Sequence, residues 1–203
     1  MDIFEVIYSQ RAMRRLKPDP VPDDLIWKVL DAAIRAPSGG NRQPWNFLVV
    51  RDAAIRQKIA EWYLEGWESS YGRIREMALA NPATAKTFRS ADYLAHRLAD
   101  VPVFIIATVN NAGVAPVSPP GASVYPAVQN LMLAARALGL GTTLTTVHRS
   151  HEAEVKQLLG IPDGIDTLAL IPLGWPRGKF GAGERLPVEK VTYWDKWGAT
   201  RER

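Results

Sequence analysis

Four short apolar segments with strand character, separated by helical segments, constrain the fold of this 203-residue chain most strongly. They span residues 46–50, 101–109, 142–147 and 167–173. Residues 46–50 and 101–109 show little polar alternation, so we expect both to be buried on two faces, whereas 142–147 is rich in β-branched residues. Buried strands need helices to cover them. The pattern predicts one domain, residues 1–203, with an α+β fold of the α/β sandwich type.

Apolar residues at helical spacing predict the helices that would cover these strands. The predicted helical segments are residues 2–9, 23–35, 53–98, 122–138 and 151–159. The segment 122–138 is almost entirely apolar, which favours a central position. Residues 116–121 are expected to form a loop. The tail, residues 186–203, is polar but carries three aromatic residues, Tyr193, Trp194 and Trp197. Aromatic residues in such a tail often anchor it on another surface.

Composition excludes several classes of site. The chain has no cysteine, so disulfides, thiol nucleophiles and cysteine-ligated metals are excluded. Its three histidines are too few and too scattered to indicate a metal site, and none is expected. No apolar run approaches the roughly 20 residues of a membrane span, so no membrane partner is expected. The N-terminus lacks a basic and then apolar signal pattern, which makes the cytoplasm the expected location.

Residues 37–45, Pro-Ser-Gly-Gly-Asn-Arg-Gln-Pro-Trp, form an unusual junction between a predicted helix and a predicted strand. Asn41 and Gln43 each offer donors and an acceptor, which suits the mixed edge of a flat heterocycle. Ser38 adds a hydroxyl, and the glycines would let the backbone approach a ligand closely. The residues are equally consistent with an ordinary capped turn, because Ser, Gly, Asn and Pro are the residues of turns.

Arg11, Arg14 and Arg15 form a cationic cluster at the end of the first predicted helix. The guanidinium fork matches phosphate oxygens bidentately. A solvated helix end and a nucleic-acid patch are the alternatives. Nucleic-acid binding would need more basic residues and exposed aromatics nearby, and the prolines that follow do not supply them. The net charge of +4 fits an anionic ligand as well as it fits nucleic acid.

These motifs, followed by Gly139-Leu140-Gly141-Thr142-Thr143-Leu144, Gly174-Trp175-Pro176 and Arg185-Leu186-Pro187-Val188-Glu189, occur in an order that resembles the nitroreductase family. Members of that family are FMN-dependent NAD(P)H oxidoreductases that act as homodimers. The resemblance covers nearly the whole chain and is weakest between residues 53 and 98. It implies a mixed, mostly antiparallel sheet flanked by helices, and a C-terminal tail, 186–203, exchanged with the partner subunit.

The resemblance also implies the cofactor-binding residues, with Ser38, Asn41 and Gln43 serving the flavin of the other subunit. The expected FMN contacts are Arg11, Ala12, Arg14, Ser38, Asn41, Gln43, Thr143, Leu144, Thr145 and Arg185. Ala12 stands where the family often has serine, so only its backbone N–H remains for a phosphate. Arg15 is expected to point away. No catalytic side chain is expected, because hydride enters at flavin N5.

The aromatic-rich segment 53–98 is the candidate for a lid or insertion over the substrate. Trp62, Trp67 and Tyr71 are the expected substrate contacts, and with Tyr63 they could share one helical face. That face could equally be core. Gly139-Leu140-Gly141 is not a dinucleotide fingerprint, since it follows a helix and lacks a third glycine. A nicotinamide donor would therefore stack in the open flavin site and leave before the acceptor enters.

The favoured hypothesis is an FMN enzyme that transfers hydride from NADH or NADPH to a flat electron-poor acceptor, such as a nitroaromatic or quinone, by ping-pong turnover. The choice between the two nicotinamides, or a deazaflavin donor, is left open by the sequence. Alternatives on the same scaffold are reductive dehalogenation, enone reduction and flavin cleavage. A non-catalytic flavin-binding protein and a basic nucleic-acid binder are the hypotheses from other classes.

Overall fold

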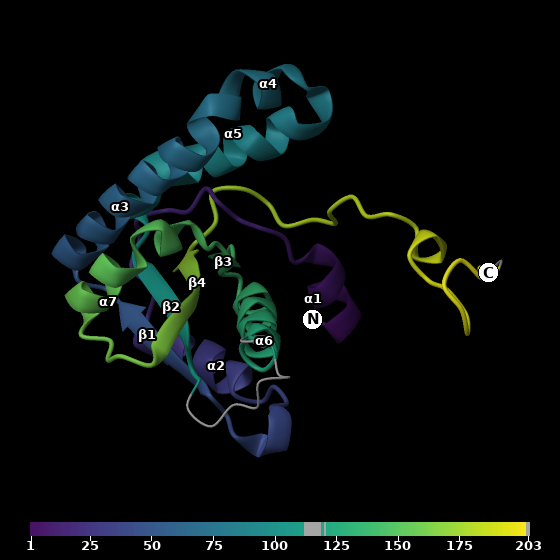
Figure 1. Cartoon of the computed structure of the whole chain (residues 1–203), viewed down its shortest axis with the longest axis horizontal. Coiled ribbons are helices and arrows are strands. Elements are labelled where there is room, and N and C mark those ends of the chain that lie inside the picture. Colours follow the sequence, from purple (N-terminus) through teal and green to yellow (C-terminus); the bar gives the residue numbers. More distant parts are fainter. Residues whose placement is uncertain (112–118, 120, 202–203) are drawn as a thin grey trace.

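A four-stranded antiparallel sheet lies at the centre of the computed structural model, which describes residues 1–111, 119 and 121–201 (Figure 1). The strands are β1 Trp45–Val50, β2 Val103–Asn110, β3 Gly141–Thr142 and β4 Ile165–Gly174, in the order β1-β2-β4-β3. Every pairing among the described residues is antiparallel. The predicted α+β fold is confirmed, while a parallel partner that would make the sheet mixed does not occur within this part of the chain.

Seven α-helices surround the sheet in the described residues. They are α1 Ile3–Ser9, α2 Asp23–Ala33, α3 Ala53–Tyr71, α4 Arg75–Ala80, α5 Pro82–Arg97, α6 Val124–Ala137 and α7 Glu152–Leu159. Short 3₁₀ segments add Gly39–Asn41, Gly72–Ile74, Leu98–Asp100, Val147–His151 and Val188–Lys190. The helices expected from apolar spacing are therefore present, except that 53–98 is divided into three.

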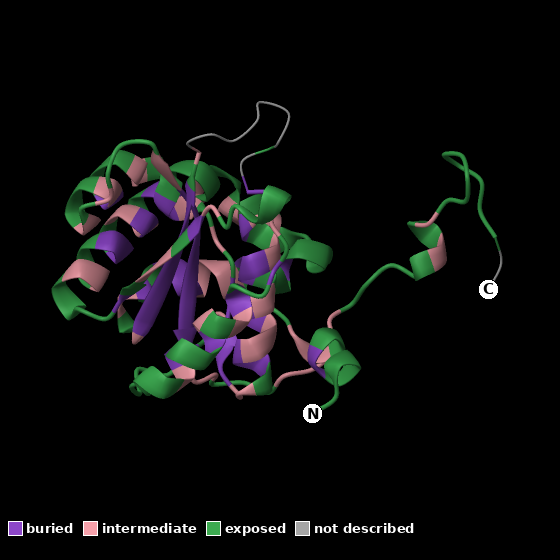
Figure 2. Cartoon of the chain, turned by 90° about the horizontal axis from the view of Figure 1, so that it is seen from below, coloured by how far each residue is buried: buried purple, intermediate pink, exposed green. Residues whose placement is uncertain are grey.

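Alternating side chains of β2 build two separate cores, one on each face of the sheet. Val103, Ile105 and Ala107 face the core shared with α2 and α6. Phe104 and Ile106 face the core shared with α3 and α5. This period of two is the burial pattern expected of a central strand covered by helices on both sides, and Figure 2 shows the buried sheet between its exposed layers.

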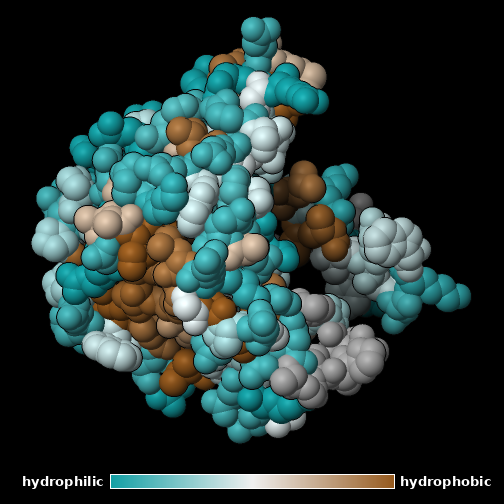
Figure 3. All heavy atoms as spheres, turned by 60° about the vertical axis from the view of Figure 1, so that its left-hand side comes forward, coloured by the Kyte–Doolittle hydropathy of each residue, from teal (hydrophilic) through white to brown (hydrophobic). Residues whose placement is uncertain are grey.

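The edge strand β1 departs from expectation. It was expected to be buried on both faces, but Asn46 and Val49 are exposed, and Phe47 and Leu48 are half-buried. The prediction was wrong because β1 is an outer strand that pairs only with β2 among the described residues. On the side of the molecule where α3, β1 and α7 lie, hydrophobic side chains reach the surface (Figure 3).

The predicted strand at 142–147 is also largely wrong. Only Gly141 and Thr142 pair with β4, Thr145 makes one isolated bridge with Leu170, and a 3₁₀ helix begins at Val147. Threonine hydroxyls can take partners outside a ladder, and Thr145 Oγ1 lies 2.8 Å from Tyr63 Oη on α3. The predicted 116–121 loop falls mainly outside the described residues.

An extended N-terminal segment runs beside the end of the sheet. The N–H of Met13 donates to Thr142 O at 2.8 Å, and the N–H of Lys17 donates to Trp175 O at 2.8 Å. Gly141 makes this approach possible, since an added Cβ would lie 2.9 Å from Met13 Cβ. Gly139, at φ +80°, ends α6. The two glycines of this motif therefore serve the backbone.

Two parts of the chain project from this body. Helices α3, α4 and α5 extend beyond the sheet as an arm, and the tail runs away from the body past α1 (Figure 1). The tail leaves its large apolar side chains open to solvent, and Trp197 is 90% exposed. Among the described residues no helix is both long enough and apolar enough to cross a membrane.

Candidate active site

A cavity of about 210 Å³ lies where the N-terminal segment, the arm and the loop after β3 meet. Its lining residues are Arg14, Tyr63, Trp67, Tyr71, Ala91, Leu94, Thr143, Leu144, Thr145, Thr146 and Val147. Six of the predicted site residues are among them, although they come from three distant parts of the sequence: Arg14, Trp67, Tyr71, Thr143, Leu144 and Thr145. The cavity therefore combines a cation, a backbone segment and an aromatic wall.

Arg14 supplies the positive charge of this cavity. It is partly buried, and it makes no hydrogen bond or ion pair to any residue that the structure describes. Burial lowers the pKa of Arg14, with a smaller opposing effect from the Tyr63 hydroxyl. Arginine nevertheless stays protonated at neutral pH. A desolvated guanidinium without a protein partner is suited to bind an anionic or carbonyl-rich ligand.

Tyr63 lines the cavity and is a functional candidate that was not among the expected contacts. Its hydroxyl lies 2.8 Å from Thr145 Oγ1. Burial raises the pKa of Tyr63, while the Thr145 hydrogen bond and Arg14 oppose that rise. The phenol is therefore protonated at neutral pH and can donate. Its spacing of four residues from Trp67 was the sequence signal that could have identified it.

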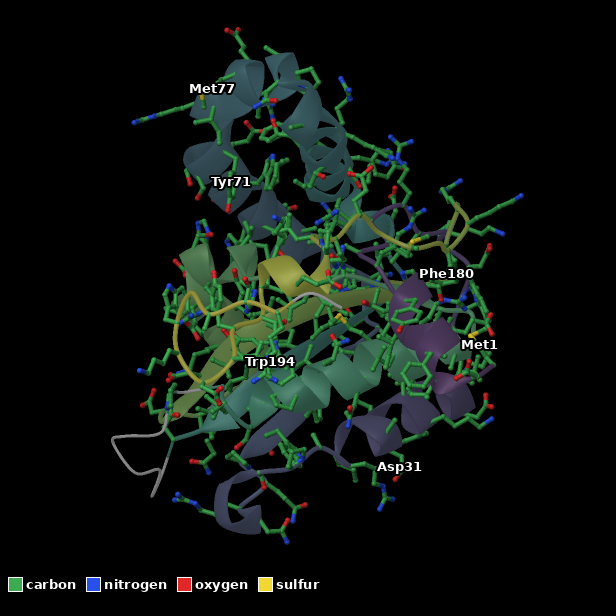
Figure 4. All side chains as sticks on the ribbon, turned by 90° about the vertical axis from the view of Figure 1, so that its right-hand side faces the viewer. Met1, Asp31, Tyr71, Met77, Phe180 and Trp194 are labelled. Atoms are coloured by element: carbon green, nitrogen blue, oxygen red, sulfur yellow. The ribbon has the colours of Figure 1, made fainter. Side chains whose placement is uncertain are left out.

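The aromatic wall is formed by Trp67 and Tyr71. Their ring centroids are 4.5 Å apart at an interplanar angle of 30°. Trp67 is buried and belongs to a core cluster, and it also lines the cavity. In Figure 4, Tyr71 lies between the body and the outer tip of the arm, which Met77 marks.

Trp62 does not join this wall. Its indole stacks on His151 at a centroid distance of 6.4 Å, and Lys58 Nζ lies 5.2 Å from its ring centre. Trp62 therefore faces the junction between α3 and the 3₁₀ helix Val147–His151 and does not line the cavity. The helical rotation between positions 62 and 63 sends the two side chains to different faces.

Three other arginines, Arg11, Arg15 and Arg185, lie outside the cavity. Arg11 Nη2 donates to Lys179 O at 2.7 Å, and Arg185 Nη1 donates to Glu184 O at 2.8 Å. Ala12 is exposed and does not line the cavity. Arg15 lies over the Tyr93 ring, with its guanidinium carbon 4.4 Å from the centroid, which is away from the cavity as expected.

The junction 38–43 is a tight, left-handed loop. Gly40, Asn41 and Gln43 have φ values of +59°, +54° and +50°. The N–H of Gln43 donates to Ser38 Oγ at 3.0 Å, and the Gln43 amide donates to Asn41 Oδ1 at 3.3 Å. Side chains at positive φ are strained, and such strain is concentrated at ligand sites. Ser38 holds the loop, while the amides of Asn41 and Gln43 are exposed.

This loop does not reach the first cavity. Gln43 lines a second cavity of about 290 Å³, between the loop and the start of α6, and no residue lines both cavities. Figure 1 shows the loop between α2 and β1 at the end of the molecule remote from the arm. The predicted site residues therefore form two groups that one chain does not bring together.

One carboxylate-rich group lies behind the aromatic wall. Glu68, Asp92 and His96 have ligand atoms within 4.8 Å of one another. Arg75 Nη2 stands between Glu68 Oε1 at 2.6 Å and Asp92 Oδ1 at 2.7 Å. A guanidinium therefore occupies the position that a metal ion would take.

A protein-family model and individual relatives match most of the chain. The Nitroreductase family model matches residues 7–175. A putative NADH dehydrogenase/NAD(P)H nitroreductase of Methanothermobacter thermautotrophicus is 29% identical over 97% of this chain and 88% of its own length. The crystal structure of a protein with the same description from Parabacteroides distasonis has a TM-score of 0.74 at 25% identity, covering 96% of this chain and 98% of that one.

A third similarity concerns the fold. Iodotyrosine deiodinase, crystallised with FMN and 3-iodo-L-tyrosine, shares the fold at a TM-score of 0.73 and 23% identity, over 92% of this chain and 97% of that chain. Because the family model covers most of its length, the chain belongs to the nitroreductase family. It is an oxidoreductase of that family, as the order of its motifs predicted.

Proposed function

We propose that this protein is a homodimeric FMN enzyme that transfers hydride from NADH or NADPH to a flat electron-poor acceptor, such as a nitroaromatic or a quinone. The observation that carries the proposal is the unpartnered, partly buried Arg14 guanidinium in a cavity bounded by the backbone of 143–147 and by aromatic rings. A cation of this kind is suited to the pyrimidine carbonyls of a flavin, where negative charge gathers on reduction.

The residues of the cavity fit an isoalloxazine ring. Arg14 would hold its pyrimidine edge, and the backbone N–H groups of Thr143 and Leu144 would be available to the flavin N5. The Thr145 N–H already donates to Leu170 O at 3.0 Å. When bound, the flavin supplies a ring that takes up and releases hydride. Tyr63 keeps its phenolic proton at neutral pH and holds the Thr145 hydroxyl in place. Arg11 and Arg185 carry guanidinium groups on exposed segments that would have to turn to reach a phosphate.

A second copy of the chain would complete the site. The loop with Ser38, Asn41 and Gln43 lies apart from the first cavity, so it would serve the flavin held by the partner. The strained positive φ of Asn41 and Gln43 presents their amides outward. Donor and acceptor would then enter the same opening in turn, since the sequence has no separate dinucleotide fingerprint. Ping-pong turnover would follow, because the donor must leave the opening before the acceptor enters it.

The tail would embrace the partner subunit. Most of its described side chains are exposed in one chain. One edge of β1, six residues long, has no strand partner among the described residues, whereas β3 has only two residues. An unpaired edge is a template for an added strand. We therefore expect the tail of one subunit to extend the sheet of the other along β1.

The tail proposal predicts a large effect from a residue that touches little in one chain. Replacing Trp197 by serine is expected to weaken the dimer by about 30-fold or more, because a buried interface tryptophan contributes about 2 kcal/mol or more. Sedimentation at several protein concentrations measures the effect. Met77→Gln on the arm, where Met77 is 68% exposed, is the control and should leave the dimer unchanged. A monomeric unaltered protein would contradict the proposal.

The first test of the flavin proposal is the visible spectrum of the purified protein before and after anaerobic NADH or NADPH. A flavin band that either donor bleaches supports the enzyme. A flavin band that neither donor bleaches would favour a flavin-binding protein without this activity. Absence of a band after addition of FMN would refute the proposal.

The second test is the Arg14→Ala variant. We expect FMN affinity to fall by about 10- to 100-fold, which corresponds to the roughly 1.5–3 kcal/mol of a hydrogen bond to a charged group. Fluorescence titration with FMN measures the change. Arg15→Ala is the matched control, because Arg15 lies over Tyr93 outside the cavity. Equal affinities in both variants would show that Arg14 does not hold the flavin.

Reductive dehalogenation is the second candidate function, and the shared fold of iodotyrosine deiodinase favours it. The described lining of the cavity includes no carboxylate to pair with the ammonium group of an amino acid. The aromatic wall therefore suits a neutral arene or quinone better than a zwitterion. Parallel assays with a nitroaromatic, a quinone and 3-iodo-L-tyrosine distinguish the two functions.

A further inference from the structure

The aromatic wall of the cavity is supported from behind by a polar network that joins all three helices of the arm. We call this group the lid network: Trp67 and Glu68 from α3, Arg75 from α4 and Asp92 from α5. Asp92 lies at its centre. Its Oδ1 accepts a hydrogen bond from Trp67 Nε1 at 3.0 Å and another from Arg75 Nη2 at 2.7 Å. One carboxylate oxygen therefore links the cavity wall to the outer arm.

The position of the Trp67 indole is determined by its neighbours on α5. Phe88 packs on one side, with ring centroids 5.6 Å apart, and Asp92, one helical turn later, accepts its N–H. On the remaining side Trp67 stacks on Tyr71, and both rings line the cavity. Packing restricts the indole to a few rotamers, and a hydrogen bond at one edge selects among them the orientation that points Nε1 at Asp92.

Arg75 fixes the outer part of the arm to the same point. It is the first residue of α4, and its Nη2 also donates to Glu68 Oε1 at 2.6 Å. The guanidinium thus joins α4 to both α3 and α5. Burial acts to raise the pKa of Asp92, but the hydrogen bonds from Arg75 and Trp67 outweigh it and lower the pKa. Asp92 is therefore ionised at neutral pH.

We propose that Asp92 and Arg75 are positioning residues that determine which acceptors the enzyme reduces. Asp92 orients the Trp67 indole, against which a planar acceptor would stack. Arg75 holds α4 against α3 and α5 in a position that leaves room for this acceptor. The proposal rests on the oxidoreductase function inferred above. The Asp92 and Arg75 side chains are 30% and 33% exposed. A partly exposed ion pair contributes little net stability, so its main effect would be on geometry.

The experiment compares Asp92→Asn, Arg75→Gln and the double variant, using holoenzyme. Asparagine keeps an oxygen for the indole N–H but removes the charge that holds Arg75. Two exposed residues of the arm without a partner in the lid network, Glu76 and Arg89, give the matched controls Glu76→Gln and Arg89→Gln. Each protein is assayed with a two-ring naphthoquinone and with one-ring p-benzoquinone, together with its flavin content.

We expect each single variant to raise the KM for naphthoquinone by about tenfold, while kcat and the flavin content stay close to those of the unaltered protein. The KM for p-benzoquinone should change much less, because a smaller ring needs less of the wall. The double variant should resemble the single ones, since both remove the same contact. The control variants should behave as the unaltered protein.

Equal changes of KM for both quinones would overturn the proposal, as would additive effects in the double variant. Loss of thermal stability with an unchanged ratio of the two KM values would assign the lid network a purely structural role. If the unaltered protein binds no flavin, the proposed function fails first, and the assay of acceptors does not apply.

Orientation of Trp67 can be followed without any activity. In protein labelled with 5-fluorotryptophan, the ¹⁹F resonance of Trp67 is identified by its absence in Trp67→Phe. Asp92→Leu, which removes the acceptor of the indole N–H, should shift or broaden this resonance, and Glu76→Gln should not. An unmoved Trp67 signal in Asp92→Leu would show that the lid network does not position the indole, whatever the fate of the flavin.

Discussion

Replacing Gly66 by alanine is expected to lower the free energy of unfolding by about 2–3 kcal/mol, as overpacking of a close contact does. Alanine is ordinarily favoured over glycine inside a helix by about 1 kcal/mol, so the expected sign is the reverse of the helix preference. The cause is local. A Cβ on Gly66 would overlap Ser150 Oγ and would lie 2.9 Å from Ser150 Cβ and 3.2 Å from Val147 O.

Gly66→Ala should also change the shape of the cavity. Ser150 Oγ donates to Val147 O at 2.8 Å, and Val147 lines the cavity together with the threonines before it. Displacing the 3₁₀ helix Val147–His151 would therefore move the wall that faces the proposed flavin. We expect Gly66→Ala to weaken FMN binding as well as folding. Urea unfolding and FMN titration measure the two effects.

A compensating substitution separates this clash from other causes. Ser150→Gly removes both the hydroxyl and the Cβ that the added methyl group would meet, so the double variant should recover most of the stability lost by Gly66→Ala. Gly181→Ala is the control, because nothing lies within 4 Å of the added Cβ. A Gly66→Ala protein as stable as the unaltered one would show that α3 does not pack this closely.

The second large effect is a loss of stability on mild acidification, caused by His148. This side chain is fully buried, and neither ring nitrogen has a hydrogen-bond partner among the described residues. Desolvation lowers the pKa of His148 from 6.5 to about 4, with Glu152 opposing and Arg149 assisting the shift. The folded state therefore holds a neutral imidazole.

The sign of the pH dependence follows from the difference between the pKa of His148 in the folded chain and its pKa in the unfolded chain. Between pH 6.5 and 4 the unfolded chain binds a proton at His148 that the folded chain does not. Stability from this group is complete above pH 6.5 and is lost as the pH falls towards 4. The expected loss is about 3 kcal/mol, at 1.36 kcal/mol for each pKa unit.

His148→Leu tests this prediction. Leucine cannot take up a proton and leaves no unsatisfied nitrogen, so the variant should be at least as stable at neutral pH and should lack most of the decline between pH 6.5 and 4. Urea unfolding at a series of pH values, at one protein concentration, gives both profiles. Parallel profiles for the two proteins would contradict a buried, neutral His148.

Side-chain periodicity predicted most of the fold because it reports burial directly. The continuous apolar runs of β2 and β4 reflect contact with a helix layer on each face of the sheet. The apolar spacing of α2 and α6 reflects the contact of these helices with one of the two faces. The same reasoning failed for β1, because an apolar run does not show whether a strand is paired on one side or on both. It failed again after Thr142, where tertiary contacts replaced a ladder suggested by β-branched residues.

The candidate site shows the same division. The positions Arg14 and Thr143–Thr145 were expected to lie near one another, and the cavity contains them all. Arg11 and Arg14 have equal claims as guanidinium groups, and only packing separates them, because Arg11 binds a backbone carbonyl while Arg14 faces the cavity. Trp62 and Tyr63 are neighbours in sequence, yet their helix directs Trp62 towards His151 and Tyr63 into the cavity.

By itself, then, the sequence determined the α+β class, the burial of the central strand β2, and which motifs place the chain in the nitroreductase family. Those properties depend on a residue and its near neighbours. The tertiary structure decided that the loop of Asn41 and Gln43 lies far from Arg14, and that Asp92 stands behind Trp67. These relations between distant segments depend on how whole helices pack on the sheet. A local sequence pattern therefore cannot predict them.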